Sequence, residues 1–164
     1  MPAKKSFNDL KEEVVKQGGY YVVLYFDIHG NSKEALKDLM VGFVGKLTQA
    51  QGVRFGVGEI EEPIEHENMY ATTAKVTMLL ESFSDLVRVC LNYGPIGVEI
   101  EEPIVAKIPA HEVQQALLEV SATSQEFTHL VLNKMMDADE KKDFARKMGA
   151  RVLLGKKIME ERKV

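Results

Sequence analysis

The sequence predicts an α+β fold, and three observations support this prediction. Segments rich in β-branched and aromatic residues alternate with segments whose apolar residues recur every three or four positions, the patterns of strands and of amphipathic helices. The hexapeptide Glu59-Ile60-Glu61-Glu62-Pro63-Ile64 recurs letter for letter at 99–104, which indicates that one supersecondary unit occurs twice. From His111 onward the pattern is that of helices alone.

Length, charge and cysteine content restrict the class of protein. With 164 residues, the chain is long enough for one hydrophobic core. The formal net charge of −4 argues against a nucleic-acid partner, because phosphate binding needs a basic surface. No apolar run approaches the roughly 20 residues that cross a bilayer, so we expect no membrane partner. The single cysteine excludes an intrachain disulfide, and together these features predict a cytoplasmic protein.

The first half of the chain reads as helix, strand, helix. Ser6 begins a pattern like a capping box, which predicts a short helix to about Lys16 that Gly18-Gly19 ends. The β-branched and aromatic run 20–26 predicts a central strand. We expect a loop at 27–31, and then a helix capped by Asn31 or Ser32 with its apolar stripe between 35 and 47.

The second half of the domain repeats this order. We expect strands at 53–60 and 69–80, a helix that begins at Ser82 or Ser84, and a strand at 96–101. Gly56 and Gly58 predict a bulge in the second strand. The order β-α-β-β-α-β is that of the ferredoxin-like fold. The strands at 53–60 and 96–101 should then form the two edges of an antiparallel sheet.

The repeated hexapeptide therefore falls on both sheet edges. Charged residues and proline on an edge strand discourage pairing with other sheets, which gives the repeat a structural purpose. We expect the two edge strands to run parallel, with both copies ending at one side of the sheet about 14 Å apart at the usual strand spacing. Solvated charges are then favoured over a metal site, and we expect no bound metal.

Three segments follow from this pattern: an N-terminal helix at 1–19, the ferredoxin-like domain at 20–107 and a C-terminal helical hairpin at 108–164. The hairpin carries a long apolar stripe with an interruption near 121–124, where a bend is expected. Such a stripe has to be covered, either by the open face of the sheet or by another copy of the chain. We therefore expect a homo-oligomer.

No pattern in the chain indicates catalysis. The four histidines lie in four different elements, and no pair has the helical spacing of a zinc site. Cys90 lies on the apolar stripe of a helix, which favours a buried small side chain over a nucleophile. We accordingly predict no catalytic residues and no cofactor.

The segment Asp27-Ile28-His29-Gly30 resembles the D-x-x-G turn of the ACT domains, small ferredoxin-like modules that bind amino acids and regulate enzymes. Element order and length are compatible with this family over residues 20–105. The resemblance implies that Asp27, His29, Gly30 and Asn31 line a site for a small effector such as an amino acid at a subunit interface. The alternative is a plain strand-to-helix turn whose polar groups satisfy local backbone.

Three functions remain open on the sequence. The leading hypothesis is a non-enzymatic small-molecule-binding or regulatory module that acts as a homo-oligomer. The second is an enzyme with an active site at a subunit interface. The third is a structural or adaptor protein that binds partners through its helical hairpin.

Overall fold

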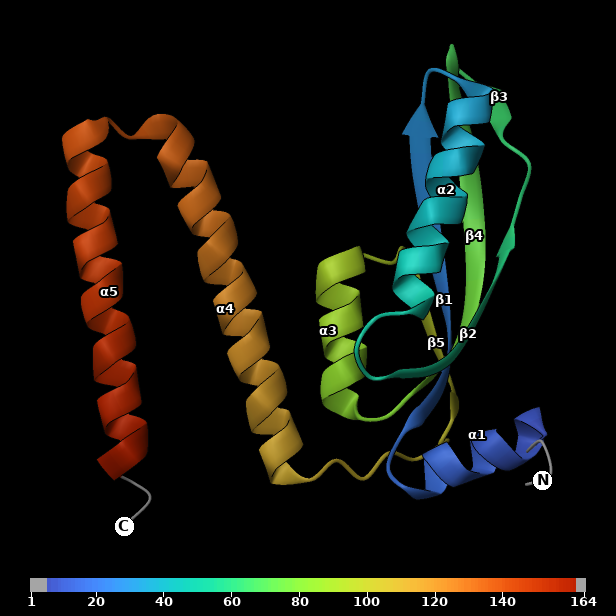
Figure 1. Cartoon of the computed structure of the whole chain (residues 1–164), viewed down its shortest axis with the longest axis horizontal. Helices are drawn as coiled ribbons and strands as arrows, with labels where there is room; N and C mark the ends of the chain where they lie inside the picture. Colours follow the sequence, from blue (N-terminus) through green and yellow to red (C-terminus); the bar gives the residue numbers. More distant parts are fainter. Residues whose placement is uncertain (1–5, 162–164) are drawn as a thin grey trace. The chain divides into compact units, whose positions relative to one another are not determined.

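The computed structural model describes residues 6–161, without the side chains of His66 and Met159, and shows an α+β fold (Figure 1). The elements, in chain order, are α1 Phe7–Lys16, β1 Tyr20–Gly30, α2 Lys33–Thr48, β2 Val53–Ile60, β3 Ile64–His66, β4 Met69–Leu80, α3 Phe83–Tyr93, β5 Gly97–Glu102, α4 Ala110–Met135 and α5 Ala138–Glu161. The predicted ferredoxin-like order is therefore confirmed, with the short strand β3 added where a connection was expected.

Serine side chains begin the helices of the domain. Ser6 and Asp9 form a capping box at α1, since each side chain accepts a hydrogen bond from the other residue's backbone N–H. Ser32, not Asn31, caps α2 through the backbone N–H of Ala35. Ser82 caps α3 in the same way. These local signals are the part of the fold that the sequence encodes most directly.

The sheet has the strand order β2-β4-β1-β5, and β3 extends it by pairing with β4. This order confirms the prediction that the two copies of the repeat lie on opposite edges. The expectation that the edge strands run parallel is wrong. Each neighbouring pair is antiparallel, so three successive reversals make β2 and β5 antiparallel to each other. The two copies of the repeat therefore end at opposite ends of the sheet.

The two faces of the sheet have different environments. Tyr20, Val22, Leu24 and Phe26 of β1 belong to the buried core, together with residues of α2 and α3. The intervening residues of β1 point to the other side, which we call the open face. Helix α1 covers one end of the open face, where Phe7 packs against Tyr21 with ring centroids 6.0 Å apart.

The glycines of β2 let α2 approach the sheet. The register shift lies between Val53 and Phe55, so the predicted bulge at Gly56 and Gly58 is wrong. A Cβ atom at Gly58 would lie 2.6 Å from Val44 Cγ1, and one at Gly56 would lie 2.7 Å from Thr48 Cγ2. Glycine is present because the helix leaves no room for a side chain.

The chain divides into two units at Val120 and Ser121, within α4. In the first unit, the start of α4 is attached to α3 by polar contacts. Glu112 accepts a hydrogen bond from the N-terminal backbone N–H of Phe83 at 2.9 Å. Arg88 pairs with Glu119 at 2.7 Å and with Asp85 at 2.8 Å. These contacts fix the first three turns of α4 to the ferredoxin-like domain.

The second unit is the hairpin segment, by which we mean residues 121–161, the later part of α4 and all of α5. The helix α4 is continuous through 121–124, where a bend was expected. The two helices run in opposite directions from the turn at 136–137 (Figure 1). Near this turn His129 stacks on Phe144, with ring centroids 5.4 Å apart. No helix among the described residues is long and apolar enough to cross a membrane.

Candidate functional site

The predicted site residues Asp27, His29 and Gly30 lie on a strand, so the expected loop at these positions is wrong. The strand β1 continues to Gly30 because β4 supplies pairing partners as far as Tyr70. Asp27 and His29 therefore point to the same side, the open face. His29 Nε2 lies 2.9 Å from Asp27 Oδ2, and both side chains are partly exposed.

Gly30 and Asn31 do not add ligand-binding groups to this face. Gly30 pairs with Tyr70, and a Cβ atom on it would lie 3.1 Å from Leu36 Cδ1. Glycine therefore allows close contact with α2. Asn31 is exposed between β1 and the cap of α2. The structure thus brings together two of the four predicted residues, Asp27 and His29.

Pairing across the sheet adds polar groups beside Asp27. Thr73 of β4 is the register partner of Asp27, and its hydroxyl donates a hydrogen bond to Glu61 Oε2 at 2.8 Å. One row further, Lys75 lies between Tyr25 of β1 and Glu59 of β2. Two adjacent rows of the open face thus carry carboxylates, a hydroxyl and an ammonium group from three strands.

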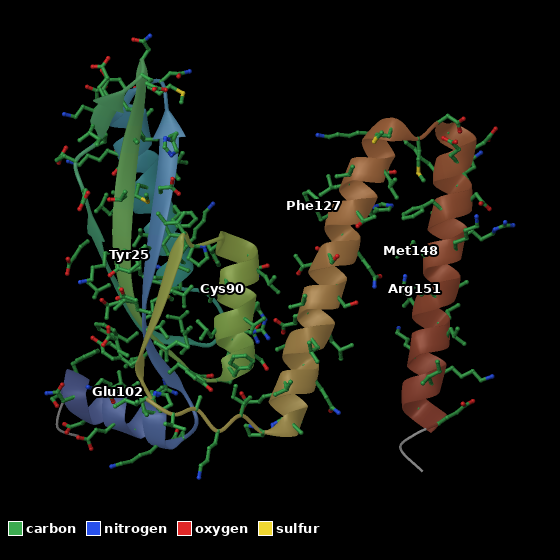
Figure 2. The ribbon with its side chains drawn as sticks, turned by 180° about the vertical axis from the view of Figure 1, so that it is seen from behind. Tyr25, Cys90, Glu102, Phe127, Met148 and Arg151 are labelled. Atoms are coloured by element: carbon green, nitrogen blue, oxygen red, sulfur yellow. The ribbon has the colours of Figure 1, made fainter. Side chains whose placement is uncertain are left out.

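Tyr25, labelled on the sheet in Figure 2, lies on β1 opposite Lys75 of this polar region. Its hydroxyl donates a hydrogen bond to Glu99 Oε2 of β5 at 3.1 Å. Burial of the ring, and then this hydrogen bond, raise the pKa of the Tyr25 phenol. The phenol therefore stays protonated and acts as a fixed hydrogen-bond donor.

Two hollows accompany these groups on the described surface. The first has a volume of about 190 Å³ and is lined by Tyr25, Glu59, Ile60, Glu61, Thr73, Ala74 and Lys75. The second has a volume of about 380 Å³ and is lined by His29, Ile64, Glu67, Met69 and Ala71. Asp27 and His29 lie on the same face as both hollows. Their small volumes suit a ligand of a few heavy atoms better than a large substrate.

The two copies of the repeat have different partners. In the first copy Glu62 pairs with Lys37 of α2, and this contact lowers the pKa of the Glu62 carboxyl. In the second copy Glu102 accepts a hydrogen bond from Lys11 of α1 at 2.5 Å. The equivalent residues Glu61 and Glu101 also differ, since Glu61 accepts a hydrogen bond from Thr73, whereas the charge of Glu101 contributes to the raised pKa of the Tyr25 phenol. Identical sequence therefore does not make two identical sites.

The described residues contain no group of three or more histidine, cysteine or acidic side chains arranged to hold a metal ion. Cys90 packs partly buried against the core, and burial raises the pKa of its thiol. A protonated, half-buried thiol is a poor nucleophile.

Sequence reasoning missed Glu59, Thr73, Lys75 and Tyr25 as members of one region. Alternation along β1 and β4 places Tyr25, Thr73 and Lys75 on the open face, and pairing with Lys75 places Glu59 of β2 there. Their alignment across three strands, however, depends on register, which no local pattern encodes.

The sheet order and the two helices on one face define a ferredoxin-like α+β domain, here followed by a helical hairpin. The model of the MJ0538 family matches residues 21–149, so the chain belongs to the MJ0538 family. Comparison with curated proteins finds no match, and neither does comparison with solved structures. Because the matched range includes all of α4 and the first half of α5, the hairpin is part of what the family model describes.

Proposed function

We propose that the chain is a non-enzymatic regulatory module that binds a small molecule on the open face and acts as a homo-oligomer. The observation that carries this proposal is the polar region on the part of the open face that α1 does not cover. There Asp27, Glu59 and Glu61 gather around Thr73 and Lys75, next to a hollow of about 190 Å³.

The charges favour a ligand with an ammonium and a carboxylate group. Asp27 and Glu61 flank Thr73 from the two neighbouring strands and offer acceptors for an ammonium group. Lys75 lies two residues further along β4, about 7 Å away at the usual rise of a strand, and offers a cation for a carboxylate. A free amino acid carries both an ammonium and a carboxylate group, close enough together to reach both of these sites. The resemblance to the ACT domains supports the same class of ligand.

One observation favours an enzyme as the second candidate. His29 lies 2.9 Å from Asp27, and a histidine oriented by a carboxylate is a common arrangement for a general base. The other side chains that line the two hollows are apolar or acidic, apart from Tyr25, Thr73 and Lys75. Binding therefore has more support than catalysis.

The experiment is a thermal-shift screen of the full chain against free amino acids. A ligand that binds the folded state raises its melting temperature by mass action. The substitution Asp27→Ala should abolish the shift while costing no more than about 1 kcal/mol of unfolding free energy, typical of one lost hydrogen bond. Asp38→Asn, on the exposed surface of α2, is the matched control and should keep the shift.

Two outcomes would contradict the proposal. In the first, no amino acid shifts the melting temperature at millimolar concentration. In the second, a ligand is found but Asp27→Ala binds it as well as the unchanged protein does. Turnover of the ligand, with loss of turnover in His29→Ala, would instead support the enzyme.

A further inference from the structure

The hairpin segment exposes a long apolar stripe. Phe127 is 69% exposed and Leu130 is 62% exposed, although both are large apolar side chains. Among the described side chains of the segment, the exposed large apolar ones are Phe127, Leu130, Val131, Met135, Val152, Leu153, Leu154 and Ile158. Figure 2 labels Phe127 on α4, and Met148 and Arg151 on α5. The exposed apolar side chains of α4 lie at helical spacing on one side, whereas Val152, Leu153 and Leu154 are consecutive and lie on several sides of α5. Exposed apolar surface of this extent marks an interaction site.

The surfaces of the ferredoxin-like domain do not match this stripe. One end of the open face is already covered by α1, and the uncovered part carries Asp27, Glu61 and Lys75 among the exposed apolar side chains of Val57, Ile64 and Met69. Burying these charges against apolar side chains would leave them without water or partners. The exposed apolar side chains of β5, such as Val98 and Ile100, lie on a strand of six residues. Such a strand spans about 20 Å, whereas α5 with 24 residues spans about 36 Å.

We infer that the hairpin segment pairs with the hairpin segment of a second copy of this chain to form a four-helix bundle. The two helices make few contacts with each other, so their apolar side chains need further helices to become the core of such a bundle. Two-fold symmetry brings the same face of both copies together. The apolar side chains of one copy then pack against those of the other, and no different protein is needed to cover them. This inference deepens the proposed function, because it gives the homo-oligomer its interface.

The size of the surface agrees with a stable dimer. Two helices side by side, each about 10 Å wide and about 22 to 36 Å long, present a face of roughly 600 Å². Stable interfaces bury about 800 Å² on each partner, and interdigitated side chains bury more area than the flat outline of the face. A second copy therefore supplies contact of the required extent.

The charges of the segment permit self-association. Residues 121–161 contain eight lysines and arginines and seven aspartates and glutamates, so two copies meet with little net repulsion. Several of these charges are already paired within α5. Asp143 contacts Arg146 at 2.6 Å and Lys147 at 2.7 Å, and Lys157 lies 3.9 Å from Glu161. Mixed charges of this kind suit the polar rim of a bundle.

The test is the mass of the full chain in solution, measured by light scattering after size exclusion between about 1 and 50 µM. We expect a dimer or a larger even assembly. The double substitution Phe127→Asp and Leu130→Asp should give a monomer with an unchanged circular dichroism spectrum. Leu39→Asp, on an exposed apolar position of α2, is the matched control and should keep the dimer.

Three results would overturn the inference: a monomer at 50 µM, a dimer that survives both aspartates, or a dimer that Leu39→Asp disrupts. A further experiment is co-sedimentation with vesicles that contain phosphatidylserine. A monomer that sediments with these vesicles would show that the stripe binds a lipid surface and not a second copy. The mass is measured without amino acids, so its outcome is independent of the ligand test. A monomeric variant that still shows the thermal shift would separate the interface from the ligand site.

Discussion

The packing of α2 against β2 depends on the missing side chain of Gly58. A Cβ atom at this position would lie 2.6 Å from Val44 Cγ1, closer than nonbonded carbon atoms allow. Val44 is buried and β-branched, so its χ1 rotamer cannot easily change within the helix. We therefore expect Gly58→Ala to force α2 away from the sheet, next to Glu59 and Glu61 of the proposed ligand site.

The expected size of the effect follows from two opposing contributions. Overpacking a closed core costs about 1–3 kcal/mol. Replacing glycine within a strand returns about 0.5–1 kcal/mol, because the unfolded chain loses conformational freedom. Subtracting the second range from the first gives a net destabilisation of about 0–2.5 kcal/mol, with a central value of about 1 kcal/mol. For a chain of this length the central value corresponds to a melting temperature lower by about 2–4 °C.

Urea denaturation and thermal melts of four variants test this reasoning. Gly42→Ala is the matched control, because this exposed glycine of α2 has no neighbour within 4 Å of an added Cβ atom. It should stabilise the protein by about 0.5–1 kcal/mol through helix propensity. The pair Gly58→Ala with Val44→Ala should cost less than the sum of the two single changes. Strict additivity, or a melting temperature for Gly58→Ala as high as that of Gly42→Ala, would refute the steric argument.

Two further predictions concern the sheet edge and the buried thiol. Glu101→Val, on the edge strand β5, should increase turbidity on heating, because it removes a charge that discourages pairing with other sheets. Glu101→Gln should have a smaller effect. Equal turbidity of both variants and the unchanged protein would contradict this prediction. Burial raises the pKa of the Cys90 thiol in the folded protein. The thiol's contribution to stability is therefore fully present at a pH below its pKa in the unfolded chain, about 8.5, and decreases as the pH rises toward its pKa in the folded protein. The difference in unfolding free energy between the unchanged protein and Cys90→Ala should therefore shrink between pH 8 and 10, measured by urea titration under reducing conditions. If the two curves of unfolding free energy against pH are parallel, the pKa of the thiol does not change on folding.

Much of the fold could be predicted from local patterns. The serine caps at Ser6 and Ser82, the strand at 53–60 and the order of the sheet are confirmed by the structure. These features depend on hydrophobic periodicity and on backbone groups that a nearby side chain satisfies. The two long C-terminal helices are confirmed for the same reason.

The candidate site could be predicted only in part. Asp27 and His29 were selected from a short motif, and the structure places them together on the open face. Lys75 and Glu59 are distant from them in sequence, and register alone aligns them. A local pattern identifies a polar residue on an open face, but it does not identify the residue opposite it.

The sequence by itself determined which segments become helix or strand, which side of each is apolar, and where most of them begin. The tertiary structure decided the rest. Pairing with β4 extends β1 through Asp27 to Gly30. Three strand reversals place the two copies of the repeat at opposite ends of the sheet. The close approach of α2 explains why positions 56 and 58 are glycine. Each of these features depends on contacts between residues far apart in the chain, and propensity has no information about such contacts.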